Sequence, residues 1–309
     1  MRRVLLTAGL VGLVGLLGAA KCGSTTPPPI DCTTTGSVAH TNLRYAHDAG
    51  VAPNLQSLDL YLPQRAKGCA ATPLVAYVHG GAFVTGDKAN KITDKARLFT
   101  GAGWAFASLN YRLVDHPGSG ATNGEYPAAE QDIAAGLAYL ADHAEDYALD
   151  PHRIMLLGHS AGAFLVSLVS TDGSFVEAAG IDASDVVCTA PLDTTYDIPA
   201  QVASGGSEAA MFRNAFGDDP AVWQQASPPN NVAPGDDIPA FHIVTRGQPA
   251  RVAQSQAFAT TLTNAGFAAD AQVVRGLTHD EVNAAVGQTG ETVVTKPLMD
   301  FYRDCARST

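Results

Sequence analysis

The sequence predicts an α/β fold in which helices cover both faces of a mostly parallel central sheet. Three observations support it. Segments typical of strands alternate with segments typical of helices, which is the order that βαβ units produce. The 309 residues are 46% hydrophobic, enough to bury a large core. Residues 73–78 (PLVAYV) form a continuous apolar run, as expected of a strand covered on both faces.

Seven strands are expected along the chain. The first, 57–62 (SLDLYL), alternates polar and apolar residues and is therefore expected to have one exposed face. The other six are mainly apolar runs, typical of buried strands. They cover 73–78, 104–111, 153–157, 186–192, 240–245 and 271–274.

Helical spacing predicts the covering layers. Apolar residues recur every three or four positions in 127–148, 252–265 and 298–305, and a short apolar run at 164–170 directly follows a strand. Gly266 is expected to end the second of these helices. These apolar stripes pack against the sheet, so we assign them no chemical role.

Two segments interrupt the alternation. Residues 116–123 are rich in Gly, Ser and Pro and are expected to form a loop. Residues 193–239 mix Pro, Gly, Asn and acidic residues with short helical stretches. Because 47 residues are too many for a simple connection, we expect this segment to form a lid over a site at the top of the sheet.

The N-terminus is typical of an export signal. Arg2 and Arg3 precede an almost uncharged stretch at 4–20, and small residues end it, so 1–21 are expected to direct secretion to the periplasm, cell surface or medium. An uncleaved membrane anchor is the alternative, since 17 apolar residues can just span a bilayer. Residues 22–36 are Thr- and Pro-rich and are expected to form a tether ahead of a catalytic domain at 37–309.

Cys22 and the polar residues after it resemble the start of a bacterial lipoprotein. That resemblance implies a lipid on Cys22, although Lys21 stands where lipoproteins have a small residue and argues against it. The remaining four cysteines allow three disulfide connectivities in an oxidising compartment. Cys188 lies in an apolar run, so a buried thiol is the alternative there. No cysteine or histidine spacing indicates a metal site.

The charge balance excludes some partners. Only 16% of the residues are charged, and the net charge is −11. An acidic chain without a basic block is unsuited to binding nucleic acid or anionic lipid. Contact with a membrane is therefore expected only through an N-terminal lipid or anchor.

Residues 158–162 (GHSAG) are typical of a nucleophile elbow. They follow the strand at 153–157 and precede a helical run, which is the context that presents a serine hydroxyl above a sheet. Ser160 is the candidate nucleophile, and the backbone N–H of Ala161 at the helix start can face a developing oxyanion.

Two further features fit the elbow. Residues 79–83 (HGGAF) follow the strand at 73–78, and their small residues let backbone N–H groups converge on one point. His279 follows the last expected strand and comes after Ser160 in the chain, as a base in this order must. The other histidines receive no catalytic role; His242 is expected in the core, and His159 is the variable position of the elbow.

Five motifs together resemble serine hydrolases of the α/β-hydrolase superfamily, in the carboxylesterase branch that includes hormone-sensitive-lipase-like and feruloyl-esterase-like enzymes. They are HGGAF, LNYRL (109–113), YPAA (126–129) with Asp132, DPHRI (150–154) and GHSAG. The resemblance implies an α/β-hydrolase fold and hydrolysis of small-molecule carboxylic esters without a cofactor. It further implies that Ser160 is the nucleophile, His279 the base, and that Gly81, Ala82 and Ala161 donate to the oxyanion.

The acid departs from the family pattern. The family places an Asp shortly after the next-to-last strand, and the equivalent stretch here, 246–252, contains no carboxylate. Some α/β-hydrolases place the acid one strand earlier, which points to Asp193, with Asp197 as the second candidate. Ester hydrolysis is the first hypothesis, amide or peptide hydrolysis by the same residues the second, and a non-catalytic binding module the third.

Overall fold

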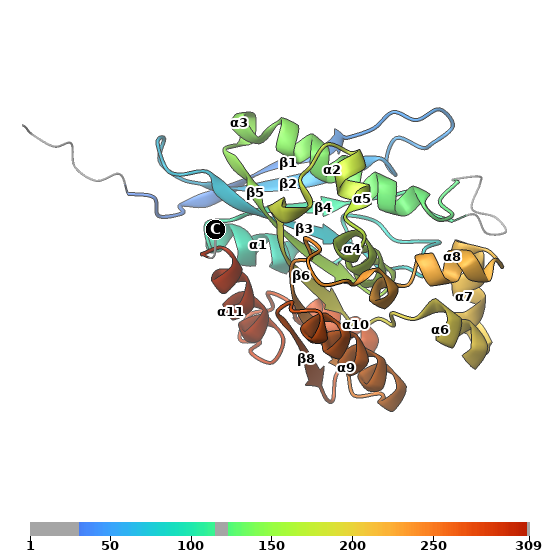
Figure 1. Cartoon of the computed structure of the whole chain (residues 1–309). Helices are drawn as coiled ribbons and strands as arrows, with labels where there is room; N and C mark the ends of the chain where they lie inside the picture. The colour runs from blue at the N-terminus through green and yellow to red at the C-terminus, as the bar shows by residue number, and fades with distance from the viewer. Residues whose placement is uncertain (1–30, 115–122, 308–309) are drawn as a thin grey trace, which may run out of the picture. The chain divides into compact units, whose positions relative to one another are not determined.

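The computed structural model describes residues 31–114 and 123–307, which form one sheet covered by helices (Figure 1). Within those residues the sheet has eight strands in the order β1-β2-β4-β3-β5-β6-β7-β8. β1 and β2 pair antiparallel, as do β2 and β4, and the other pairs are parallel. The strands are β1 (Gly36–Arg44), β2 (Ser57–Gln64), β3 (Thr72–Val78), β4 (Ala105–Leu109), β5 (Leu149–His159), β6 (Val186–Leu192), β7 (Ala240–Arg246) and β8 (Ala269–Val274).

The helices lie between and beyond the strands. They are α1 (Thr93–Gly101), α2 (Ala128–Asp142), α3 (Ala144–Tyr147), α4 (Ala161–Thr171), α5 (Ser174–Ala178), α6 (Ile198–Ser204), α7 (Gly206–Phe216), α8 (Pro220–Gln225), α9 (Pro249–Asn264), α10 (His279–Ala285) and α11 (Thr295–Cys305). The expected helix at 127–148 is divided at His143 into α2 and α3. Gly266 takes a left-handed φ of 100° just beyond α9, as expected of a residue that ends a helix.

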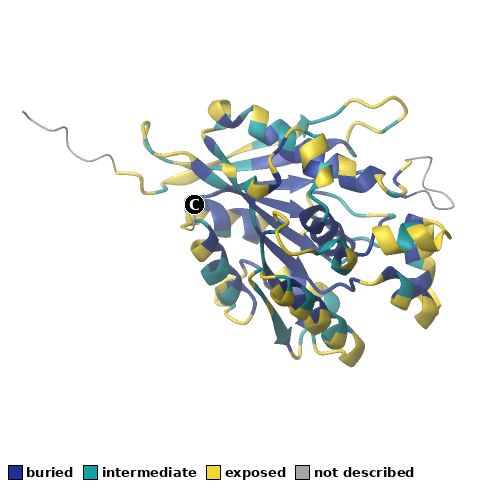
Figure 2. Ribbon diagram, viewed as in Figure 1, coloured by how far each residue is buried: buried dark blue, intermediate teal, exposed yellow. Residues whose placement is uncertain are grey.

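Apolar cores lie on both faces of the sheet. α2 and α4 pack against one face, where Ile133, Leu137 and Phe164 are buried. α1, α10 and α11 pack against the other, where Phe99, Val282 and Leu298 are buried. The central strands are buried on both faces (Figure 2). This arrangement confirms the expected α/β class.

The antiparallel edge of the sheet differs from the expectation. β1 was not anticipated, because its mostly exposed residues lack an apolar pattern. The expectation of an exposed face on the first predicted strand is wrong: Ser57 and Asp59 in β2 are both buried. The carboxylate of Asp59 lies 2.9 Å from Nζ of buried Lys88, which comes from the loop after β3. This ion pair lets a polar residue occupy a buried position of the strand.

The segment 193–239 forms α6, α7, α8 and a short 3-10 turn, grouped together in Figure 1. It does not lie loosely over the sheet. Phe212 and Phe216 of α7 pack against Phe164 of α4 and Phe83, with ring centroids 5.2 to 5.8 Å apart. All four rings are buried. The segment expected to be a lid therefore contributes to the core.

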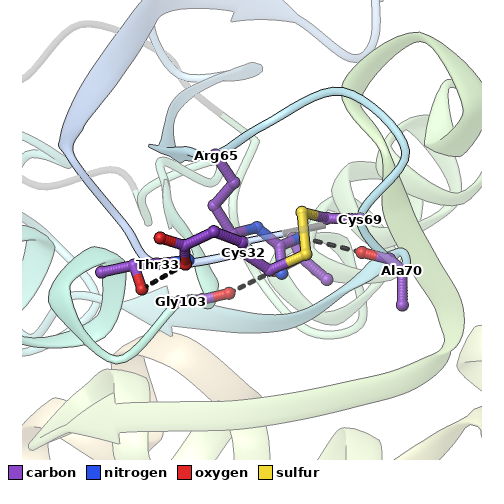
Figure 3. Close-up of a disulfide and its surroundings, with 8 residues drawn as sticks. Cys32, Thr33, Arg65, Cys69, Ala70 and Gly103 are labelled. Atoms are coloured by element: carbon purple, nitrogen blue, oxygen red, sulfur yellow. Dashed lines mark hydrogen bonds between the residues drawn. A yellow bond between two sulfur atoms is a disulfide. The ribbon is translucent and has the colours of Figure 1, made fainter. Parts of the chain in front are cut away.

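Two disulfides join distant parts of the chain. Cys32 pairs with Cys69 beside the hydrogen bond from Arg65 to the carbonyl of Ala70 (Figure 3). Cys188 pairs with Cys305, so the alternative of a buried free thiol at Cys188 is wrong. Since Cys32 is bonded to the domain, the end of the expected tether, from residue 31 to 36, is fixed at the edge of the sheet.

Several N-terminal features lie outside the described residues: the export signal at 1–21, Cys22 and the first part of the tether. The same holds for most of the expected loop at 116–123. In the part of the chain that is described, no helix combines the length and the apolar character needed to cross a membrane.

The two disulfides are expected to stabilise the fold unequally. In the chain-entropy description the stabilisation grows with the loop that is closed, and these loops span 37 and 117 residues. Replacing Cys188 and Cys305 by Ala should therefore lower the free energy of unfolding by about 1 kcal/mol more than replacing Cys32 and Cys69. Urea unfolding of the two double variants measures the difference. A larger loss from the shorter loop contradicts the prediction.

Candidate active site

Ser160 stands in a strained turn between β5 and α4. Its φ of 56° and ψ of −121° lie outside the usual regions for a residue with a side chain. The turn requires Gly162, since a Cβ there would lie 2.2 Å from the carbonyl oxygen of Val78. The local sequence thus places the serine hydroxyl at the carboxyl end of the sheet, with α4 starting at the next residue.

The loop after β3 curls beside Ser160. Gly81 has a φ of 131°, and a Cβ on it would lie 1.8 Å from the carbonyl oxygen of Thr85, so only glycine fits. Ala82 follows with a φ of 55°, which costs a residue with a side chain backbone strain. Within the described residues, the N–H groups of Gly81, Ala82 and Ala161 donate no hydrogen bond. They remain able to donate hydrogen bonds to a substrate oxygen.

His279 is the first residue of α10, and a capping box fixes the start of that helix. The hydroxyl of Thr278 accepts from the N–H of Glu281, whose carboxylate accepts from the N–H of Thr278. Nδ1 of His279 lies 2.6 Å from Oδ2 of Asp193. The contact fixes the tautomer, because Nδ1 must carry the proton and Nε2 is then free to accept one.

Asp193 is buried directly after β6 and has a φ of 53°. The backbone N–H of Arg246 donates to its Oδ1 at 3.0 Å, and the guanidinium of Arg251 donates to its carbonyl oxygen at 3.1 Å. Burial opposes ionisation of Asp193. The hydrogen bonds from His279 and Arg246, with the charge of Arg251, outweigh that effect and lower its pKa below the usual value. The carboxylate therefore stays charged.

The two candidate acids are in different places. Asp197 is exposed at the start of α6, where its side chain accepts from the N–H of Ala200 at 2.9 Å. It caps a helix, whereas Asp193 contacts His279. The stretch 246–252, in which the family pattern would place an acid, instead contributes the Arg246 and Arg251 contacts to Asp193.

Two other residues considered in the sequence analysis, Asp132 and His242, make contacts that stabilise the fold and do not reach Ser160. Asp132 in α2 accepts hydrogen bonds from the backbone N–H and the guanidinium of Arg112 and makes none with His279. His242 is buried in β7, with Nδ1 3.0 Å from Asp270. His159 is different: it is buried beside His279, a contact that the elbow motif alone does not reveal.

A cavity of about 490 Å³ opens over Ser160, between the loop after β3 and the start of α10. Its lining is rich in polar groups and includes Gly81, Ala82, Ser160 and His279 together with Thr85, Asn90, Lys91, Asp280 and Asn283. No hydrogen bond joins Oγ of Ser160 to His279 among the residues described; in such sites this bond commonly tightens when substrate binds. Nor do three His, Cys, Asp or Glu side chains approach closely enough there to hold a metal ion.

A buried polar network supports the far side of this cavity. Nζ of Lys95 in α1 donates to the carbonyl oxygen of Asn283 at 2.7 Å, and the hydroxyl of Tyr77 donates to the Asn283 side chain at 3.0 Å. Burial, reinforced by the nearby charge of Lys91, lowers the pKa of Lys95 to about 7. The network joins α10, and hence His279, to α1 and β3.

Residues 58–262 match the family model described as BD-FAE. The chain belongs to the BD-FAE family. Together with the strained serine turn and the order of the strands, this membership identifies the chain as an α/β-hydrolase of the esterase and lipase group. The matched range ends before His279, so the assignment of the base depends on the geometry above.

Several known proteins are similar to this chain. Esterase LipQ of Mycobacterium tuberculosis is 27% identical over 67% of this chain and 49% of its own length. The ethyl acetate hydrolase of Pseudomonas putida is 24% identical over 72% of this chain and 70% of its own length. The matches cover only part of these relatives: the chain spans about half the length of LipQ, and a 112-residue match covers 32% of the length of esterase LipI of Mycobacterium tuberculosis.

Solved structures share the fold. Esterase B of Lactobacillus rhamnosis, inhibited by a tributyrin phosphonate, aligns with a TM-score of 0.71 at 21% identity, covering 89% of this chain and 87% of that one. A truncated carbohydrate esterase from gut microbiota aligns with a TM-score of 0.68 at 22% identity, covering 90% and 99%. The expected α/β-hydrolase fold is confirmed.

The buried amine of Lys95 should make stability depend on pH. Its pKa is about 7 in the folded protein against 10.5 for the free side chain, so between these values the unfolded chain binds more protons. The contribution of Lys95 to stability therefore rises with pH across this window, by up to about 1.4 kcal/mol per pH unit. Relative to Lys95→Met, the wild type should gain stability from pH 7 to pH 10, as measured by urea unfolding.

Exposed Lys296 provides the matched control, because Lys296→Met removes a lysine without removing a buried amine. The difference between wild type and this variant should stay nearly constant over the same pH range. If the free energy of unfolding of the wild type, relative to that of Lys95→Met, falls with rising pH, the assignment of a buried, largely neutral amine is contradicted.

Proposed function

We propose that this protein is a serine hydrolase that cleaves carboxylic esters through an acyl-enzyme on Ser160. One observation carries the proposal: buried Asp193 holds the imidazole of His279 at 2.6 Å, at the rim of the cavity that contains Ser160 and the N–H groups of Gly81 and Ala82. A nucleophile, an oriented base and free N–H donors at one point are the groups that acyl transfer requires.

In the proposed first step, Nε2 of His279 removes the proton of Ser160 while Oγ attacks the ester carbonyl carbon. The developing oxyanion accepts hydrogen bonds from the N–H groups of Gly81, Ala82 and Ala161. Asp193 keeps Nδ1 of His279 protonated and stabilises the imidazolium. Nε2–H then protonates the leaving ester oxygen as its bond to the carbonyl carbon breaks, and the alcohol is released.

In the proposed second step, water replaces the alcohol. His279 takes a proton from the water, whose oxygen attacks the acyl carbon, and the same three N–H groups stabilise the second oxyanion. Return of the proton to Oγ of Ser160 releases the carboxylic acid. The chain's own residues perform each proton transfer of this scheme.

The relatives support an ester substrate. LipQ is named an esterase, and the Pseudomonas putida relative is named an ethyl acetate hydrolase. No observation favours an amide. The binding-module hypothesis drew its support from the missing carboxylate at 246–252, and a carboxylate on His279 is available from Asp193 instead.

We propose also that the protein is exported. The basic, apolar and small-residue pattern of 1–21 supports this proposal. The disulfides Cys32–Cys69 and Cys188–Cys305 add to that support, because disulfides persist mainly in oxidising compartments.

Ser160→Ala should abolish both labelling by a fluorophosphonate probe and hydrolysis of p-nitrophenyl acetate. Asp193→Asn should lower kcat by about 10⁴-fold, because an uncharged partner stabilises the wrong tautomer of His279 and no longer stabilises the imidazolium. Mass spectrometry of the labelled peptide measures the reaction with the probe, and assays of p-nitrophenyl acetate hydrolysis measure kcat.

Asp197→Asn is the matched control, since it makes the same change four residues away at a helix cap. It should keep kcat within about twofold of the wild type, as is usual for surface substitutions. A wild-type protein that neither reacts with the probe nor hydrolyses the ester would falsify the proposed function. Full activity in Asp193→Asn would reject Asp193 alone.

A further inference from the structure

His159 contacts three parts of the site at once. It precedes Ser160 in the elbow, and its ring is only 5% exposed. Its Nε2 lies 2.9 Å from the backbone carbonyl oxygen of His279, and the two rings are 4.5 Å apart. On the other side is Gly80 of the oxyanion loop, where an added Cβ would lie 3.1 Å from Nδ1 of His159. The ring thus fills the space between that loop and the start of α10.

The protonation state of His159 follows from these contacts. Burial, reinforced by the neighbouring His279, lowers the pKa of His159 to about 3, so the ring is neutral at ordinary pH. A carbonyl oxygen can only accept, so the proton of the neutral ring must be on Nε2. Neutrality also matters chemically, because a charged ring 4.5 Å away would oppose formation of the His279 imidazolium.

We infer that His159 is a positioning residue for the base: its Nε2–H holds the backbone of His279, and thereby sets where the His279 ring meets Ser160. The inference deepens the proposed function and rests on it for the role of His279. The bond joins the residue next to the nucleophile directly to the backbone of the base, so the two groups keep one relative placement.

The other contacts of α10 do not duplicate this role. The capping box joins Thr278 to Glu281 within the start of the helix and makes no bond to the elbow. Lys95 and Tyr77 hold the helix at Asn283, one turn further along. Asp193 holds the ring of His279 at Nδ1 but not its backbone. Loss of the His159 bond should therefore free the first residue of α10 while the helix stays attached. A small displacement at the base is enough to lower the rate of acyl transfer.

Replacement of His159 by Gln and by Leu tests the inference. Gln carries an N–H donor at nearly the distance of Nε2, whereas Leu fills similar space without a donor. Leu should lower kcat for p-nitrophenyl acetate by about tenfold or more with little change in KM, as expected for loss of one buried hydrogen bond. Gln should restore most of kcat. His242→Leu, which removes a similarly buried histidine of β7, controls for loss of stability and should keep the wild-type kcat.

A second measurement does not require activity. The proton on Nδ1 of His279, in its short bond to Asp193, should give a far-downfield proton NMR signal that the Asp193→Asn variant lacks. The signal should persist in His159→Gln and shift or broaden in His159→Leu. Thermal unfolding of each variant verifies that it is folded.

The outcomes separate the two proposals. Equal kcat in the Gln and Leu variants, whether both unchanged or both reduced, overturns the positioning role, as does an unaltered NMR signal in His159→Leu. A wild type without ester hydrolysis overturns the proposed function, and the NMR comparison then still decides whether His159 positions His279.

Discussion

The parallel pairing of β3, β5 and β6 is the constraint on which the site depends. Val78 pairs with Gly158, and His159 pairs with Leu192, so three strands end side by side. The loop with Gly81 and Ala82, the proposed nucleophile Ser160 and the proposed acid Asp193 each follow one of these ends. Because carboxyl ends of parallel strands share one edge, three groups distant in sequence meet without a long connecting segment.

Asp193, the proposed acid, follows β6, and residues of the neighbouring strand β7 and of α9 hold it in place. Asp193 leaves β6, and β7 contributes the backbone N–H of Arg246, while Arg251 lies in the first turn of α9. A cationic stretch thus stands where the family pattern has a carboxylate, and it offsets the burial of a charge that comes from the neighbouring strand.

Much of the fold was predictable, because buried parallel strands are continuous apolar runs and the elbow needs glycines at 158 and 162. Other features depend on tertiary contacts that no local pattern encodes. β1 lacks an apolar pattern, and the burial of Asp59 depends on a lysine 29 residues away. The sequence favoured Asp193 over Asp197 without deciding between them, since a left-handed φ at Asp193 and the backbone of β7 direct the Asp193 carboxylate to His279. The contact of His159 likewise depends on where α10 begins.

The disulfide between Cys188 and Cys305 has a consequence for strand register. It attaches β6 covalently to α11 near the amino end of the strand, and Asp193 follows the other end. A one-residue slip of a strand turns every side chain to the opposite face, and would carry Asp193 away from His279. Such a slip would have to move Cys188 relative to α11. The cross-link therefore holds the alignment of Asp193 from the opposite end of the strand.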